Sequence, residues 1–497
     1  MKLTELLKDV NFKSNQCSLN VEVLDICLNS KEVISGSLFF ARKGHNQNGE
    51  DYIKEAFLNG AVAVITENEK LLEIYSNKLV IVVKDISFAI NKIAYKFFKP
   101  NKKRVKVLGV VGTNGKTTTI HILRSILSKA GYNCGIIGTL GIEYANKVIE
   151  PSLTTPDSIE LYKNLMNMAN ENVDYCIMEV SAHAIEQKRV DLIKFEGLIF
   201  TNCTHDHLDY FKTFENYKNV KKSIFNKRHT KIAVINVDDK VGLEIMKESD
   251  AKIFSYGIYS PCDVFAIDIK NSAKNVKFLM NLFDNLLAVS FKMMGEFNVL
   301  NCLGASTLLY ALNIDEKYIL EGLLSLDGVK GRMEFIESYN GANIYVDYAH
   351  TPDGLLNTLV NLRKTTKNQL ILVFGCGGNR DKDKRKIMGE IAGKNADFTV
   401  ITNDNPRYEE AYKIILDIES GILNTTSNYI KIESRYLATG YAIKMLKKGD
   451  TLVVCGKGGE DKQEIMGERI SYSDKEVIKD IIAKLYLCGE IIWKLFY

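Results

Sequence analysis

Short runs of consecutive hydrophobic residues alternate with longer stretches in which apolar residues return every three or four positions. Runs such as Leu370–Phe374 and Leu452–Cys455 are typical of strands buried on both faces of a parallel sheet. The three- and four-residue spacing predicts helices, for example over Lys384–Lys394 and Glu409–Leu423. Strands that alternate with helices predict an α/β fold with doubly wound, parallel or mixed sheets.

The same patterns predict elements along the rest of the chain. Further strands are expected at Ser37–Ala41, Ala61–Ile65, Tyr175–Val180, Gly197–Thr201, Ile344–Val346 and Phe398–Thr402, β-structure over 251–292, and helices over Asp51–Asn59 and Phe214–Arg228.

A charged stretch that contains a proline, Lys99–Arg104, predicts a linker, and a new segment begins near Gly331. The 497 residues suggest about three domains. We expect domains at 1–101, 102–329 and 330–487, with a tail at 488–497. The third domain would hold a Rossmann-like parallel or mixed sheet.

One turn carries a recognisable chemistry. An apolar run ends in the loop Gly112-Thr113-Asn114-Gly115-Lys116-Thr117-Thr118, and a helical pattern follows it. Such a loop points backbone N–H groups and a helix N-terminus at phosphates, and its lysine reaches the outer phosphates. The threonine after the lysine would offer its hydroxyl to Mg²⁺. The common form of the loop has a glycine where this chain has Val110, so we predict a variant nucleoside triphosphate site in the second domain.

Composition narrows the possible partners. The net charge of +4 is too balanced to indicate nucleic acid binding or an anionic membrane surface. The apolar runs are far too short to span a bilayer, and the N-terminus lacks the apolar core of a signal peptide. Ten scattered cysteines without a CxxC pair are typical of a cytoplasmic protein with reduced thiols.

Polar clusters follow several predicted strands. They are Glu179–His183, Thr201–Tyr210, Asp347–His350, Gly375–Asp381, Asn403–Arg407 and Gly456–Glu460. Because ligands in such sheets bind beyond the carboxyl ends of the strands, we expect the last four clusters to form one binding edge. The Gly375 cluster is not a dinucleotide fingerprint, because Arg380 occupies the third glycine position of GxGxxG.

Two of these clusters admit other chemistry. His205 and His207 could bind zinc, although no cysteine or third histidine stands at helical spacing to complete a tetrahedral set. Ser181 near His183 could be a nucleophile, although no GxSxG elbow surrounds it. The lysines of the predicted helix Phe214–Arg228 are consistent with a solvated basic face.

Taken together, the motifs resemble those of the Mur ligases, which build the peptide stem of bacterial cell-wall precursors. The resemblance covers all but about the last ten residues. It is carried by GTNGKTT at 112–118, MEVS at 178–181, Thr201-Asn202, DHLDY at 206–210, Phe297-Asn298 through Asn301, GRME at 331–334, DYAHTPD at 347–353, Gly377–Asp381 and DNPR at 404–407. It implies a three-domain ligase that uses ATP and Mg²⁺ to join an amino acid to a UDP-muramoyl dipeptide through an acyl phosphate, and it implies a monomer.

The resemblance also assigns residues to each ligand. ATP would contact the loop residues Gly112, Thr113, Asn114, Gly115, Lys116, Thr117 and Thr118, together with Asn298, Asn301, Arg332 and Asp347. The UDP-muramoyl dipeptide would contact Leu28, Ser30, His45, Asn46, Gln47, Thr154, Thr155, Ser181, Gln187 and Arg189. The metal would be held by Thr117, Glu179, His207 and Lys221, and catalysis would involve Lys116, Glu179, His207 and Lys221. Lys221, not Lys222, matches a lysine that the family carbamylates to a carboxylate.

The third-domain motifs indicate which amino acid is added. Arg380, Asp404, Asn405, Pro406, Arg407, Gly456 and Glu460 resemble the site of family members that add meso-diaminopimelate. Two arginines can hold the distal carboxylate of that amino acid, and Glu460 its distal ammonium. The family often has histidine at Gly459, so lysine or a related diamino diacid such as lanthionine remains an alternative. A folylpolyglutamate-type ligase and a nucleotide-hydrolysing switch or motor are further alternatives, but neither explains the third-domain motifs.

Overall fold

The computed structural model describes residues 1–16, 18–44, 47–99, 105–150, 152–425 and 428–496, with residues 488–496 described by their backbone only. Contacts divide the chain into two compact units. The first comprises Met1–Leu108, Tyr132–Glu196 and Arg228–Lys231, and the second comprises Gly109–Gly131, Gly197–Lys227 and Ile232–Tyr497. His45, Asn46 and the predicted linker residues 100–104 lie outside the described residues.

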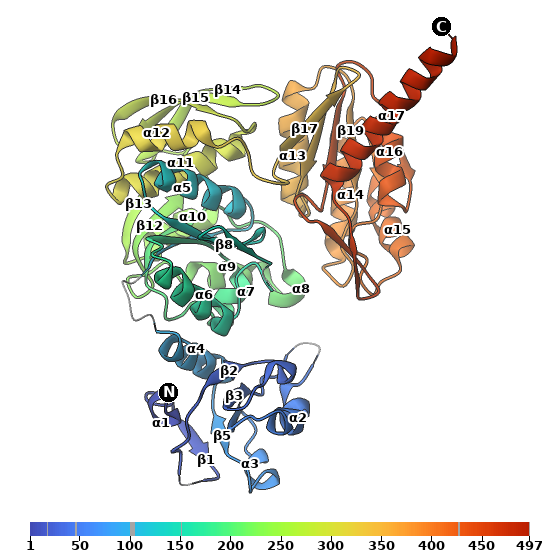
Figure 1. Ribbon diagram of the computed structural model, residues 1–497. Helices are drawn as coiled ribbons and strands as arrows, with labels where there is room; N and C mark the ends of the chain where they lie inside the picture. Colours follow the sequence, from blue (N-terminus) through green and yellow to red (C-terminus); the bar gives the residue numbers. More distant parts are fainter. Residues whose placement is uncertain (17, 45–46, 100–104, 151, 426–427, 497) are drawn as a thin grey trace. The chain divides into compact units, whose positions relative to one another are not determined.

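A small five-stranded sheet in the order β1-β5-β4-β3-β2 occupies the N-terminal part of the first unit (Figure 1). Its strands are β1 (Phe12–Ser14), β2 (Asp25–Cys27), β3 (Ser37–Phe40), β4 (Ala63–Thr66) and β5 (Val80–Val83), all parallel except β1. Its helices are α1 (Leu3–Leu6), α2 (Ile53–Leu58), α3 (Leu71–Ile74) and α4 (Ile86–Phe97), with short 3-10 helices at Ser30–Glu32 and Gly49–Tyr52. The strand predicted at Ala61–Ile65 thus begins two residues later than expected.

The rest of the first unit is built around a second set of strands. These are β7 (Cys134–Gly138), β8 (Gly141–Tyr144), β9 (Lys147–Ile149) and β10 (Tyr175–Val180), with helices α6 (Ser158–Asn170) and α7 (Ala182–Glu186). β10 pairs in parallel with β7, whereas β8 and β9 continue antiparallel. β6 (Lys106–Val111) and β11 (Phe195–Phe200) contain residues of both units.

One buried amide ties α4 to the loop after α7. Asn91 on α4 is 1% exposed, and its Nδ2 donates to the carbonyls of Lys188 and Arg189 at 2.7 and 2.8 Å and to Ser158 Oγ at 3.2 Å. Asp85, which caps α4, forms an ion pair with Lys188. The loop that carries Gln187 and Arg189 is therefore fixed from the N-terminal part of the same unit.

The second unit begins with the predicted phosphate loop and its helix. Its helices are α5 (Lys116–Lys129), α8 (Leu208–Phe211), α9 (Phe214–Lys222), α10 (Lys240–Glu248), α11 (Glu296–Ala311) and α12 (Glu316–Ser325). Its strands β12 (Thr230–Asn236), β13 (Lys252–Gly257), β14 (Val264–Asn271), β15 (Val276–Leu282) and β16 (Asn285–Phe291) pair in chain order. The β-structure expected over 251–292 is confirmed.

The helix predicted at Phe214–Arg228 is too long. α9 ends at Lys222, where the amide of Ser223 donates to the carbonyl of Asn219. The chain then turns so that Ile224 and Phe225 become buried. Burial of these two apolar side chains outside the helix explains why the helical pattern extends past the true end.

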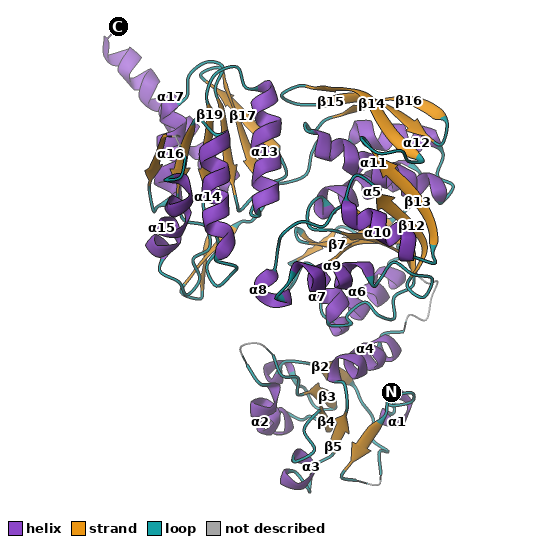
Figure 2. Ribbon diagram, turned by 180° about the vertical axis from the view of Figure 1, so that it is seen from behind, coloured by secondary structure: helices purple, strands orange, loops and turns teal. Residues whose placement is uncertain are grey.

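The last part of the second unit contains a six-stranded sheet in the order β17-β18-β22-β19-β20-β21 (Figure 2). The strands are β17 (Glu334–Tyr339), β18 (Ala342–Asp347), β19 (Leu370–Phe374), β20 (Phe398–Ile401), β21 (Asn428–Lys431) and β22 (Thr451–Cys455), and all but β17 run parallel. The helices are α13 (Pro352–Thr365), α14 (Asp383–Asn395), α15 (Ala411–Ile422), α16 (Arg435–Met445) and α17 (Asp474–Phe496), and a hairpin is formed by β23 (Lys462–Ile465) and β24 (Glu468–Ser471).

Both faces of this sheet are covered by helices, as the hydrophobic runs predict. Leu370, Leu372 and Phe374 of β19 pack with residues of α13, α14 and α15. The intervening residues Ile371 and Val373 pack with residues of α16 and α17. Side chains of a strand alternate between faces, so a strand with two covered faces must be apolar throughout. The predicted α/β class with parallel and mixed sheets is confirmed.

Within the described residues, none of the helices combines the length and the apolar character that crossing a bilayer requires.

Candidate active site

Two glycines of the phosphate loop are required by close contacts. A Cβ at Gly112 would lie 1.8 Å from Thr201 Oγ1. Gly115 has φ of +85°, and a Cβ there would lie 2.5 Å from Asn301 Oδ1. Glycine is the residue that adopts positive φ without strain. The loop therefore closes tightly between β6 and α5, with its backbone amides near the N-terminus of α5, where an anion is favoured.

The lysine and threonine that follow the loop are already held in place. Lys116 Nζ donates to the carbonyls of Gly112 and Thr113 at 2.9 and 2.8 Å. Thr117 Oγ1 accepts from Arg332 Nη2 at 2.8 Å, and the Arg332 guanidinium lies 4.1 Å from the centre of the Tyr348 ring. Arg332 thus contacts the residue after the loop lysine, and its predicted contact with ATP stays a prediction.

Amide side chains extend this network. Asn301 Nδ2 donates to Asn298 Oδ1 at 3.1 Å, and Asn301 Oδ1 accepts from Thr119 of α5 at 3.2 Å. Asn114 Nδ2 donates to Asp353 Oδ2 at 2.7 Å, a carboxylate whose role the sequence did not indicate. Because Thr119 also donates to the carbonyl of Gly115 at 2.8 Å, the loop and the predicted ATP contacts Asn298 and Asn301 belong to one connected set of contacts.

Asp347 is used by the protein itself. Its carboxylate accepts from the amides of Met333 and Ala349 at 2.6 and 3.0 Å and from Thr358 Oγ1 at 3.0 Å. Burial raises the pKa of this carboxyl group. Asp347 thereby fixes the segment that carries Arg332, and its predicted contact with ATP stays a prediction.

Lys221 and Lys222 are neighbours in α9 but lie in opposite environments. Lys222 is partly buried and pairs with Glu244 at 2.8 Å and with Glu248 at 2.6 Å. Lys221 is fully buried; its Nζ donates to Thr113 Oγ1 at 2.7 Å and lies 4.0 Å from the centre of the Tyr217 ring. Burial lowers the pKa of the Lys221 amine to about 7. The two lysines therefore differ in burial and in partners, and the assigned role of Lys221 stays a prediction.

Charged and imidazole side chains gather in the turn after β11. His207 Nε2 lies 3.3 Å from Asp206 Oδ2, and His205 Nε2 lies 3.3 Å from Asp381 Oδ2. Burial alone would raise the pKa of Asp206, but neighbouring His207, His350, Lys384 and Lys116 lower it to about 2. A carboxylate that stays ionised in this turn is suited to a cation. The two histidines contact different carboxylates.

The first unit brings together the residues predicted to hold the muramoyl dipeptide. Arg189 donates to the carbonyl of Thr155 at 2.7 Å and to Gln187 Oε1 at 2.7 and 3.2 Å. Thr155 Oγ1 lies 3.2 Å from Ser181 Oγ and donates to the carbonyl of Glu179 at 2.8 Å.

Thr139 connects Glu179 to the remaining member of this set. The Glu179 carboxylate accepts from the amide and hydroxyl of Thr139 at 2.9 and 3.2 Å. Thr139 Oγ1 in turn lies 3.2 Å from Thr154 Oγ1. Thr154, Thr155, Ser181, Gln187 and Arg189 are thus one hydrogen-bonded group around Glu179.

The predicted uridine-side residues lie in the small sheet's part of the first unit. Ser30 is buried, and its Oγ donates to Glu55 Oε2 at 2.6 Å. Leu28 is half-buried, whereas Gln47 is exposed. Their contact with uridine stays a prediction.

The turns after β18, β19, β20 and β22 lie at one edge of the six-stranded sheet, because these strands are parallel. Gly378 donates its amide to the carbonyl of Asn405 at 2.8 Å, and a Cβ at Gly378 would lie 1.9 Å from the carbonyl oxygen of Pro406. A Cβ at Gly456 would lie 2.4 Å from Asp404 Oδ2. The turns that carry Arg380, Arg407 and Glu460 are therefore in direct contact, as predicted.

A buried lysine in this edge was missed. Lys457 is fully buried and donates to Asn405 Oδ1 at 2.9 Å and Glu460 Oε2 at 3.0 Å, while Asn405 Nδ2 also donates to Glu460 at 3.0 Å. The sequence did place Lys457 in the Gly456–Glu460 turn, but only Gly456 and Glu460 of that turn were predicted as site residues.

Arg385 supports the same edge from behind. It is 1% exposed, donates to both oxygens of Glu409 at 3.0 Å and reaches the carbonyl of Gly377 at 3.3 Å. Glu409 accepts from the amide of Asn379, so the ion pair joins the turns that carry the two predicted arginines.

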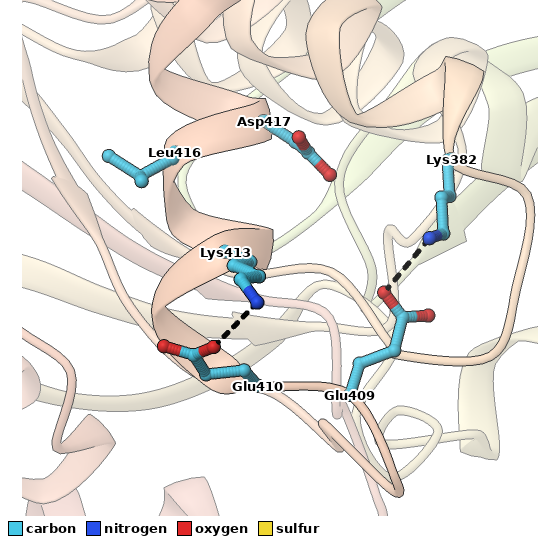
Figure 3. A pocket seen from close by; sticks show the side chains of 6 residues that line it. All are labelled: Lys382, Glu409, Glu410, Lys413, Leu416 and Asp417. Carbon is cyan, nitrogen blue, oxygen red and sulfur yellow. Dashed lines mark ion pairs between the residues drawn. The ribbon is translucent and has the colours of Figure 1, made fainter.

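A pocket on the outer side of this ion pair contains none of the predicted site residues. It is lined by Lys382, Glu409, Glu410, Lys413, Leu416 and Asp417, and Figure 3 shows its two ion pairs, Lys382–Glu409 and Lys413–Glu410.

Comparison with known proteins agrees with this arrangement. Three models of the Mur ligase family match this chain. The model of the family's catalytic domain matches residues 23–108, the model of the middle domain matches residues 110–309, and the model of the glutamate ligase domain matches residues 331–458. A relative from Clostridium tetani, named UDP-N-acetylmuramoyl-L-alanyl-D-glutamate--2,6-diaminopimelate ligase, is 39% identical over 98% of this chain and 100% of its own length. A relative of the same name from Caldanaerobacter subterraneus is 39% identical over 97% and 99%.

A solved structure of an enzyme with this name has 29% sequence identity and a TM-score of 0.66, covering 93% of this chain and 95% of its own. These relatives align with nearly the whole chain, so the similarity includes all three stretches that the family models match. The chain belongs to the Mur ligase family.

Proposed function

We propose that this protein is an ATP-dependent ligase that adds meso-diaminopimelate to UDP-N-acetylmuramoyl-L-alanyl-D-glutamate, a step of peptidoglycan precursor synthesis. The observation that carries the proposal is the shared edge of the six-stranded sheet. There the turns of Arg380, Arg407 and Glu460 are in contact, which suits an amino acid with a carboxylate and an ammonium at its far end. The names of the full-length relatives agree with this substrate.

The phosphate loop activates the acceptor. A carboxylate does not react with an amine at neutral pH, so its oxygen attacks the γ-phosphorus of ATP, ADP leaves, and an acyl phosphate remains. Lys116, Thr113 and the N-terminus of α5 would stabilise the charge on the moving phosphoryl group. Lys116 would then leave the loop carbonyls it contacts here. The amine of the diamino acid attacks the carbonyl carbon, loses a proton and releases phosphate.

The Thr117 hydroxyl and the carboxylates of the site are oxygen donors, which Mg²⁺ prefers as ligands. When bound, it would neutralise phosphate charge. We assign Thr117, Glu179, His207 and modified Lys221 as its ligands. Asn298, Asn301 and Arg332 would position the nucleotide, Arg332 through the Thr117 contact described above.

Lys221 is suited to carbamylation because it is buried, donates to a hydroxyl and holds its amine at a pKa of about 7. The neutral amine adds to CO₂, forming one N–C bond and releasing one proton, and the product is a carbamate anion. Carbamylation thus places an oxygen ligand for the metal at a position where the sequence encodes an amine.

The hydrogen-bonded group around Glu179 would hold the muramoyl dipeptide. Arg189 offers a guanidinium to its carboxylate, and Thr154, Thr155 and Ser181 offer hydroxyls. Leu28, Ser30, Gln47 and the undescribed His45 and Asn46 would hold the uridine end. In the third domain, Arg380 and Arg407 would take the distal carboxylate, Glu460 the distal ammonium, and Asp404, Asn405, Pro406 and Gly456 would shape the pocket.

Phosphate release from ATP tests the proposal. The assay contains UDP-muramoyl-dipeptide and offers diaminopimelate, lanthionine, lysine or no amino acid, and mass spectrometry identifies the product. We expect release to require both substrates and to be fastest with diaminopimelate. Release without either substrate would support a switch or motor instead. Faster turnover with lysine or lanthionine would refute the assigned specificity, and glutamylation of a folate would favour the folylpolyglutamate-type alternative.

We further propose that the enzyme acts as a monomer in the cytoplasm, on small-molecule substrates and not on nucleic acid. Its balanced charge supports the last point. Light scattering after size-exclusion chromatography tests the monomer, and a mass of twice 56.0 kDa would contradict it.

A further inference from the structure

The hairpin β23–β24 contacts the Asp404–Arg407 turn along its whole length. The amide of Arg407 donates to the carbonyl of Glu464 at 3.1 Å, and the carbonyl of Arg407 accepts from Met466 at 2.7 Å. Gln463 Nε2 donates to the carbonyl of Asp404 at 2.6 Å. The amide of Glu464 donates to Asn405 Oδ1 at 2.9 Å. The hairpin therefore determines the backbone of the turn.

Arg407 has an unusual conformation in this contact. Its φ is +52°, in the left-handed region that residues with a Cβ rarely adopt. Both of its backbone hydrogen-bonding groups are bound to the hairpin, which explains how the strained conformation is kept. Strain that is held in this way is common where a side chain must point in one direction.

The hairpin also holds the Arg407 side chain. Glu464 Oε2 accepts from Arg407 Nε at 3.1 Å, and the carbonyl of Gly378 accepts from Nη1 at 2.8 Å. Two bonds to different atoms of a planar guanidinium fix its orientation. Neither bond uses Nη2, so the hydrogens of that nitrogen remain for a ligand.

Charge gives Glu464 a second effect. Burial and the nearby Arg407 both lower the pKa of Arg380, so the two arginines repel each other. A carboxylate beside Arg407 offsets that repulsion. Without it, the two guanidiniums would be driven apart and would converge less well on one carboxylate.

We propose that Glu464 is a positioning residue for substrate specificity: it orients Arg407 so that this arginine and Arg380 bind the distal carboxylate of the incoming diamino acid. This inference rests on the proposed function. Glu464 reaches the substrate only through Arg407. In the opposite role, Glu464 would occupy Arg407 and compete with the substrate carboxylate. The two roles predict opposite changes in KM.

Three variants of the full chain test the proposal. Glu464→Ala removes the acceptor, and Glu464→Gln keeps an acceptor for Nε without the charge. Glu468→Ala is the matched control, because Glu468 is an exposed carboxylate on the other strand of the hairpin, opposite Ile465. KM and kcat are measured for diaminopimelate, lysine, ATP and UDP-muramoyl-dipeptide.

We expect Glu464→Ala to raise KM for diaminopimelate about tenfold or more, the usual effect of losing a hydrogen bond to a charged group. The KM values for ATP and UDP-muramoyl-dipeptide should not change. The kcat/KM for lysine, which has no distal carboxylate, should also stay constant, so the preference for diaminopimelate falls. Glu464→Gln should show an intermediate KM for diaminopimelate, because it keeps the acceptor for Nε but not the charge, and Glu468→Ala should match the wild type.

Several results would overturn the proposal. A lower KM for diaminopimelate in Glu464→Ala would show competition instead of positioning. An unchanged KM, or an equal effect of Glu468→Ala, would show that the contact has no specific role. A change in the KM for ATP of the same size would indicate general misfolding of Glu464→Ala. The test then rests on Glu464→Gln, which keeps the shape of the side chain, and wild-type kinetics of that variant would overturn the role of the carboxylate. Failure of the wild type to use diaminopimelate would instead refute the proposed function.

Discussion

Replacing Lys221 by methionine should stabilise the protein and abolish its activity. In an unfolded chain the lysine amine has a pKa of 10.5, whereas burial lowers it to about 7 in the folded protein. Folding at about pH 7.5 therefore removes a proton three units below its ordinary pKa, at a cost of about 4 kcal/mol. Methionine fills a similar volume without this cost.

The stabilisation that methionine gives up is smaller than this cost. Methionine gives up the hydrogen bond from Nζ to Thr113 Oγ1, worth about 1 kcal/mol. Thr113 keeps its contact with the Tyr217 hydroxyl at 3.2 Å. The net gain for Lys221→Met should be about 2–3 kcal/mol, since volume-conserving core changes cost little. Lys221→Ala should be near neutral, because its cavity costs about 2–4 kcal/mol.

Urea unfolding with a chelator present and CO₂ removed measures these differences, and phosphate release measures activity. Below about pH 7 both states of the wild type are protonated, so the advantage of methionine is greatest. It shrinks as the pH rises from about 7 towards 10.5, where the unfolded lysine also loses its proton. Both variants should be inactive, and only Lys221→Ala should regain activity with acetate or formate, which its cavity can admit.

Two results would refute this reasoning. If Lys221→Met unfolds at a lower urea concentration than the wild type near pH 7, burial of the amine does not destabilise the folded protein. If Lys221→Ala is fully active without added carboxylate, the amine has no role as a carbamate. Recovery of Lys221→Met with acetate would also contradict the cavity argument, because its side chain fills the space.

Other contacts lead to shorter predictions. Asn91→Leu should remove the hydrogen bonds from Asn91 to the carbonyls of Lys188 and Arg189, lower stability by about 2 kcal/mol and raise KM for UDP-muramoyl-dipeptide but not ATP, as thermal unfolding and kinetics would show. The hydrogen bonds from Arg385 lower the pKa of Glu409. The stabilisation of the fold by this ion pair is therefore present above pH 4.5 and is lost as the pH falls through the lower folded pKa, and acid unfolding of Glu409→Gln should lack that loss. Gly112→Ala should abolish ATP binding in calorimetry, because its Cβ meets a threonine hydroxyl at 1.8 Å.

Strands buried on both faces were the easiest elements to predict. Tyr175–Val180 and Leu370–Phe374 were predicted with the bounds that the structure has, because such strands appear as runs of mostly apolar residues, in which Glu179 is the one charged position. The hairpin β23–β24 was not predicted. Its first strand, Lys-Gln-Glu-Ile, is half-buried throughout and shows no alternation, and it is stabilised by its pairing with β24 and by its bonds to the Asp404–Arg407 turn.

The candidate site shows the same division. The phosphate loop is a local structure, so its seven consecutive residues were enough to predict strand, loop and helix. The partner of Arg407 could not be found in this way, because Glu464 lies 57 residues along the chain and has no motif around it. Asp347 was selected for its place after a strand, but only the fold shows that backbone amides occupy its carboxylate.

The edge to which we assign specificity is held by a charge pair that leaves its backbone little freedom. Arg435 and Asp474 are fully buried against each other at 2.7 Å. Arg435 also donates to the carbonyls of Asn403 and Cys455, the residues just before two of the substrate turns. Removing one partner of such a pair typically costs about 3–5 kcal/mol, because the other charge stays buried. A different diamino acid would therefore be accommodated by side chains within the turns, such as Arg407 and its partner, and not by moving the strands beneath them.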